Sequence, residues 1–118
     1  MQTTRDQIPS YITRDGSEIR ELMHPEVHGN RNQSLAEATI RPGCVTMLHK
    51  HLQSEELYHV VSGFGRMTLG KLTFPVMTGD TICIAPGVAH QLENTKDQDL
   101  VILCCCAPPY SHADTKLL

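Results

Sequence analysis

The sequence contains no tryptophan, and aromatic residues make up only 4% of its 118 residues. A core must therefore be built mainly from aliphatic side chains, methionine and cysteine. Basic residues are not in excess either, because 10 lysines and arginines stand against 13 acidic residues, for a formal net charge of -3. This balance argues against the basic surface that nucleic acids or an acidic membrane would require. The length fits one domain.

Long hydrophobic runs and a disulfide framework are also missing. No apolar stretch reaches bilayer length, and the opening "MQTTRDQIPS" has no hydrophobic segment typical of a signal peptide. Of the 5 cysteines, three are consecutive at residues 104–106. Neighbouring residues on a strand point to opposite faces, so this triplet is poorly placed for disulfides. We therefore expect a soluble, cytoplasmic protein with reduced cysteines.

Short apolar runs separated by turn residues fill most of the chain. Runs such as "VTMLHKHL", "LYHVVSG" and "LVILCCC" alternate with Pro-Gly, Gly-Asp and similar junctions, which predicts an all-β sandwich or barrel. The segment "SEIRELMH" near the N-terminus is compatible with a short helix or with an extended arm. We divide the chain into an N-terminal arm (1–32), a β-barrel (33–106) and a C-terminal tail (107–118).

The stretch "LHKHLQSEELYHVVSG" concentrates histidines and acids. Side chains on a strand alternate between faces, so His49 and His51 share one face and could bind the same metal ion, or they could be two surface histidines. A carboxylate beside two imidazoles would supply negative charge and an oxygen ligand. Strand alternation places Glu55 and Glu56 on opposite faces, and Glu56 is the candidate if it faces the interior with the histidines.

Two motifs in this region resemble those of the cupins, of the small single-domain (monocupin), mannose-6-phosphate-isomerase-like or cupin-2 type. "GCVTMLHKHLQSEELYHVVSG" matches G-x5-H-x-H-x4-E-x6-G, and "GDTICIAPGVAHQLEN" matches G-x5-P-x-G-x2-H-x3-N except that Ala85 replaces the first proline. The resemblance implies a cupin jelly-roll β-barrel. It also selects Glu56 over Glu55, and it implies a metal-ligand set of His49, His51, Glu56 and His90.

Such a ligand set has definite chemical consequences. Four protein ligands leave two positions of an octahedral ion open, which is typical of catalytic rather than structural metal sites. Mixed nitrogen and oxygen ligands suit one divalent transition metal ion: Fe, Mn, Ni, Zn, Co or Cu. Strand alternation further predicts that the substrate pocket is lined by Val45, Met47, Val60 and Leu92. Tyr58 shares this inward face, where it could act as a catalytic group that orients substrate or relays a proton, or serve as a core tyrosine.

The run at residues 100–106 is apolar on both faces, so both faces should be buried. We therefore expect a homodimer formed by sheet packing. Taken together, these features predict a metal-dependent enzyme that acts on a small polar molecule able to chelate the ion, as a dioxygenase, isomerase or lyase. The alternatives are a non-catalytic module that binds or senses a metal or small ligand, and a storage or structural protein.

Overall fold

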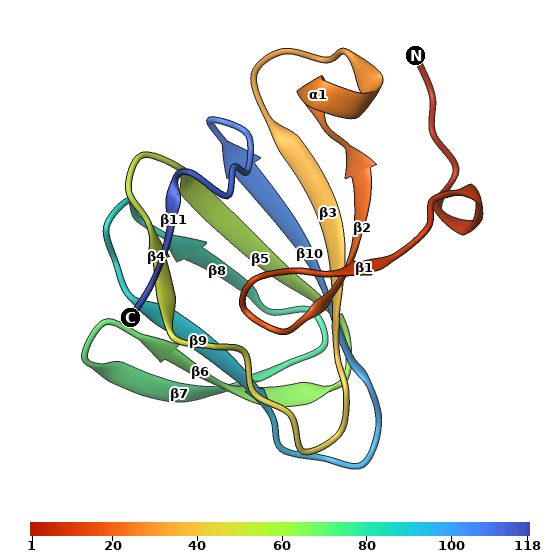
Figure 1. Ribbon diagram of the computed structural model, residues 1–118. Coiled ribbons are helices and arrows are strands. Elements are labelled where there is room, and N and C mark those ends of the chain that lie inside the picture. Colours follow the sequence, from red (N-terminus) through yellow and green to blue (C-terminus); the bar gives the residue numbers. More distant parts are fainter.

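The computed structural model describes residues 1–118 as two antiparallel β-sheets that face each other (Figure 1). The six-stranded sheet has the order β1-β2-β3-β10-β5-β8, and the five-stranded sheet has the order β11-β4-β9-β6-β7. The strands are β1 (Tyr11–Ile12), β2 (Glu18–Met23), β3 (Ser34–Ile40), β4 (His49–His51), β5 (Glu55–Ser62), β6 (Phe64–Leu69), β7 (Leu72–Met77), β8 (Thr81–Ile84), β9 (His90–Asn94), β10 (Leu100–Ala107) and β11 (Thr115–Leu117). The helical segments are a 3-10 turn (Arg5–Gln7) and α1 (Pro25–His28).

The all-β jelly roll expected from the sequence is confirmed. Burial alternates along β3, β5 and β9, so that one face of each strand meets the interior and the other meets solvent or is partly covered. The core between the sheets is largely aliphatic, as the scarcity of aromatic residues predicted. Its most deeply buried hydrophobic side chains are Val60, Met67, Ile84, Leu92, Leu100 and Ile102.

The two chain ends extend the sheets. The segment that the sequence left open between helix and extended arm forms β2, which pairs with β3. At the other end, β11 pairs with β4, the strand that carries the first two histidines. The arm therefore lies beside β3, and the tail lies beside β4. No helix of the structure has the length and apolar character that a membrane crossing requires.

Candidate metal centre

The four side chains predicted as metal ligands converge between the sheets. His49 and His51 come from β4, Glu56 from β5 and His90 from β9. His49 lies directly opposite His90 in the β4–β9 pair, and His51 reaches the same face two residues further on. All four residues are at most 4% exposed. One ligand atom from each lies within 4.8 Å of those of the others.

These separations suit a single metal ion. The Oε1 atom of Glu56 lies 3.1 Å from Nε2 of His51 and 3.4 Å from Nε2 of His90. Two ligands at right angles around an ion, each about 2.1 Å from it, lie roughly 3 Å apart. Nε2 of His90 is buried without any hydrogen-bond partner. A buried polar atom of this kind is costly unless something binds it, and a cation would satisfy it.

Hydrogen bonds set the orientation of each imidazole. Nδ1 of His49 lies 2.7 Å from the carbonyl oxygen of Met47, and Nδ1 of His90 lies 3.0 Å from that of Val88. A carbonyl oxygen only accepts, so Nδ1 carries the proton in both rings and Nε2 presents a lone pair to the site. Metal-binding histidines are normally oriented in this way, by a hydrogen bond from the ring nitrogen that does not bind the ion.

The tail orients the third imidazole. Thr115 lies opposite His51 in the β11–β4 pair. The Thr115 hydroxyl donates to the carbonyl oxygen of Ser111 at 2.9 Å, so its oxygen is available to accept from Nδ1 of His51 at 3.0 Å. Nε2 of His51 and Oε1 of Glu56 are then two acceptors in contact, and they need a cation or a proton between them.

The Glu56 carboxylate is held from its other side by a thiol. Cys106 lies opposite Glu56 in the β10–β5 pair, and its Sγ donates to Oε2 at 3.0 Å. Burial raises the pKa of the Cys106 thiol, so it stays protonated and remains a donor. Burial alone would raise the pKa of Glu56, but its close contacts with His51 and His90 lower it to about 2. The carboxyl is therefore ionised at neutral pH.

His49 is uncharged at neutral pH. Burial, followed by the charge of neighbouring His90, lowers the pKa of His49. A neutral imidazole with Nδ1 protonated can use its Nε2 lone pair to bind a metal ion. The donor set is thus three nitrogen atoms and one carboxylate oxygen, which suits a divalent transition metal.

A cavity extends from this cluster between the two sheets and is lined by 21 residues. The structure places Tyr58 and Leu92 on its wall, whereas Val60 is buried outside the lining. Burial raises the pKa of Tyr58 well above its ordinary value, so its hydroxyl stays protonated and can donate a hydrogen bond.

The structure differs from the sequence prediction at Val45 and Met47, which are 49% and 55% exposed and do not line the cavity. Thr46 takes the inward position instead. The reason is that β4 begins only at His49, so strand alternation does not continue back through the preceding residues. There, Val45 forms an isolated bridge with Glu93, and the Met47 amide donates to the carbonyl oxygen of Asp15.

Several cavity residues lie outside the motifs and were missed. Asp15, Glu21, Tyr110 and Thr115 come from the arm and the tail, where no local pattern marks them. Cys106 lies opposite Glu56 in the β10–β5 pair, a register that the sequence alone does not give. The missed residues line the same cavity as His49, His51 and Glu56.

Comparisons with known proteins agree with this architecture. Residues 36–106 match the family described as "Cupin domain". "Uncharacterized protein MJ1618" of Methanocaldococcus jannaschii is 51% identical over 118 residues, which are 100% of this chain and 94% of that protein. The polyketide cyclase RemF from Streptomyces resistomycificus has the same fold, with a TM-score of 0.84 at 20% identity over 100% of this chain and 84% of that one. A structure described as a predicted oxalate decarboxylase from Thermotoga maritima gives 0.81 at 24% identity, covering 92% and 99%.

Proposed function

Because the chain belongs to the cupin family, we propose that it is a metal-dependent enzyme acting on a small polar molecule that chelates its metal ion. One divalent transition metal ion would be held by His49, His51, Glu56 and His90. The observation that carries the proposal is the convergence of three imidazole lone pairs and one carboxylate oxygen beside a cavity, whose wall includes His49, His51 and Glu56. The orphaned Nε2 of His90 supports the presence of a cation.

The ion would act as a Lewis acid that polarises a bound oxygen atom, or as a centre for dioxygen chemistry. The protein's own groups have separate tasks. The cavity would enclose the reacting molecule, and the protonated hydroxyl of Tyr58, which lines that cavity, would donate a hydrogen bond to it. Dioxygenase, isomerase and lyase reactions all fit these parts, and a non-catalytic binding module would use the same ligand set.

The test is to purify the protein, load it with each candidate metal and measure the bound metal by elemental analysis. Dioxygen uptake and product formation by NMR are then followed with diketones, catechols and hydroxy acids. We expect one metal ion per chain and turnover with at least one metal and one substrate class. Stoichiometric metal without any turnover would favour the binding module, and no metal binding would overturn both.

We also propose that the protein forms a homodimer through the outer face of its six-stranded sheet. A row of apolar side chains crosses four neighbouring strands there, in the order Leu35, Cys105, Leu57 and Cys83. Leu57 is 40% exposed and Cys83 is also exposed. An apolar row of this kind on a sheet face is suited to packing against a second copy of itself.

Replacing Leu57 with glutamate should weaken the dimer at least about 30-fold, since it buries a charge in the centre of an interface. Light scattering coupled to size-exclusion chromatography would show a dimer for the wild type and a monomer for Leu57→Glu. Leu72→Glu is the control, because Leu72 is 65% exposed on a strand of the other sheet. A monomeric wild type, or a dimer that Leu57→Glu leaves intact, would contradict the proposal.

A further inference from the structure

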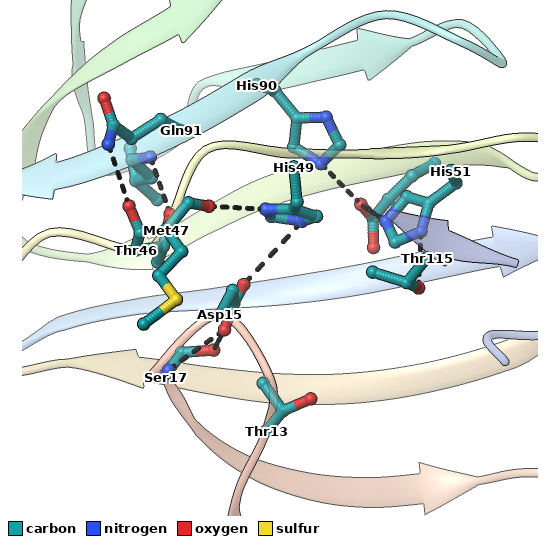
Figure 2. Close-up of polar contacts among 12 residues, drawn as sticks. Thr13, Asp15, Ser17, Thr46, Met47, His49, His51, His90, Gln91 and Thr115 are labelled. Carbon is teal, nitrogen blue, oxygen red and sulfur yellow. Dashed lines mark hydrogen bonds and ion pairs between the residues drawn. The ribbon is translucent and has the colours of Figure 1, made fainter. Parts of the chain in front are cut away.

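The turn between β1 and β2 carries a carboxylate to the metal centre. Oδ2 of Asp15 lies 3.7 Å from Nε2 of His49, the nitrogen that would bind the ion (Figure 2). Asp15 lies in the arm, outside residues 36–106 that match the family. Its side chain is 13% exposed and lines the cavity. Asp15 therefore lies at the candidate metal centre, although the ligand motifs do not include it.

Hydrogen bonds hold this carboxylate in one orientation. Oδ1 of Asp15 accepts from the backbone amide of Ser17 at 3.0 Å and from its hydroxyl at 2.6 Å. The carbonyl oxygen of Asp15 accepts from the Met47 amide at 2.7 Å, which ties the turn to the segment before β4. Nearby, the hydroxyls of Thr13 and Tyr110 lie 3.2 Å apart and connect the turn to the tail. With Oδ1 occupied, Oδ2 faces the cavity.

The cavity wall has acidic side chains but no lysine or arginine. None of the 21 lining residues is lysine or arginine, whereas three are acidic: Asp15, Glu21 and Glu56. Burial raises the pKa of Glu21, and this adds no positive charge to the wall. A divalent ion would offset at most two of the three negative charges. A ligand with two anionic groups would find one cation and no basic side chain to bind it.

We propose that Asp15 is a specificity-determining residue, which selects a metal-chelating ligand that presents a hydroxyl or amide hydrogen-bond donor beside the ion and disfavours one with a second carboxylate or phosphate. Oδ2 accepts from that donor, whereas it repels a second anionic group at the same place. The cavity has a volume of about 40 Å³, so the chelating part of the ligand is small. This inference rests on the proposed metal-dependent function.

The test uses two probes of the same shape on the Co(II)-loaded protein. Oxalate has two carboxylates, and oxamate has an amide in place of one of them. Binding of each is followed by the visible absorption of the Co(II) ion, which does not depend on turnover. The ratio of the two dissociation constants is compared between the wild type and Asp15→Asn, so the intrinsic preference of the ion cancels. We expect Asp15→Asn to shift the ratio toward oxalate by at least about tenfold.

Two further variants make the result specific. Asp97→Asn removes the same charge at an exposed site remote from the cavity, and its ratio should equal that of the wild type. Asp15→Ser keeps an oxygen that can accept from the Ser17 amide and preserve the turn, and it should shift the ratio as Asp15→Asn does. An unchanged ratio in both Asp15 variants, or an equal shift in Asp97→Asn, would overturn the inference.

The outcomes also separate this inference from the proposed function. If the wild type binds no Co(II), the proposed metal-dependent function fails. If the wild type binds Co(II) and the Asp15 variants lose it, Asp15 serves the metal rather than the ligand and the specificity role is overturned. If all variants bind Co(II) and only the Asp15 variants change the oxalate-to-oxamate ratio, the specificity role is supported.

Discussion

Replacing His90 with alanine should reduce the affinity for divalent transition metals by more than about 100-fold. Loss of a residue that only hydrogen-bonds to a metal ligand typically lowers the affinity about 10- to 100-fold, and loss of a ligand itself should cost more. His90 is the most informative ligand to remove. It is 0% exposed, and its Nε2 has no partner among the protein atoms. The His90→Ala variant would keep two imidazoles and one carboxylate, and the position of the fourth protein ligand would be left empty. Elemental analysis of the purified protein and competition with a coloured chelator would measure the effect.

His59→Ala is the matched control for this variant. His59 is exposed, and its Nδ1 contacts the Thr81 hydroxyl at 2.7 Å, away from the site. The metal affinity of the His59→Ala variant should equal that of the wild type. His90→Gln, which keeps more of the side-chain volume, separates loss of the ligand from loss of packing. Full metal occupancy in both His90 variants would show that the ligand assignment is wrong.

Replacing Gly63 with alanine should destabilise the fold by roughly 2–5 kcal/mol, a large part of the 5–15 kcal/mol that is typical of a domain. Gly63 joins β5 to β6 with a φ of 101°. A Cβ atom there would lie 2.7 Å from the carbonyl oxygen of Asp99 and 3.0 Å from Cα of Leu100. These are backbone atoms that cannot easily move. The left-handed conformation and the collision therefore both add to the cost.

Gly79→Ala separates the two contributions. Gly79 has a closely similar φ of 95°, but a Cβ atom there would meet nothing within 4 Å. Only the conformational cost of about 1–2 kcal/mol should remain. Urea unfolding of the metal-free proteins would measure the difference as a shift in midpoint at constant slope. Equal losses in the two variants would contradict the role assigned to the Gly63 contact.

Strand alternation predicted only part of the ligand cluster, the pair His49 and His51, whereas Glu56 and His90 were selected by the resemblance to the cupin motifs. Two histidines two residues apart share a face in any strand, and His49 and His51 do so in β4. The same reasoning failed for Val45 and Met47, because the chain before β4 is not a regular strand. Alternation predicts side-chain direction only where the ladder of hydrogen bonds continues.

By itself, the sequence determined the all-β jelly roll, the aliphatic core and the four side chains that converge as a possible metal site. Only the tertiary structure decided what surrounds that site. Asp15 reaches His49 because the arm crosses toward β4, and Thr115 reaches His51 because the tail pairs with β4 (Figure 1). These contacts join residues 34 and 64 positions apart in the chain. No local period encodes such contacts, because they depend on how the completed sheets bring the two chain ends together.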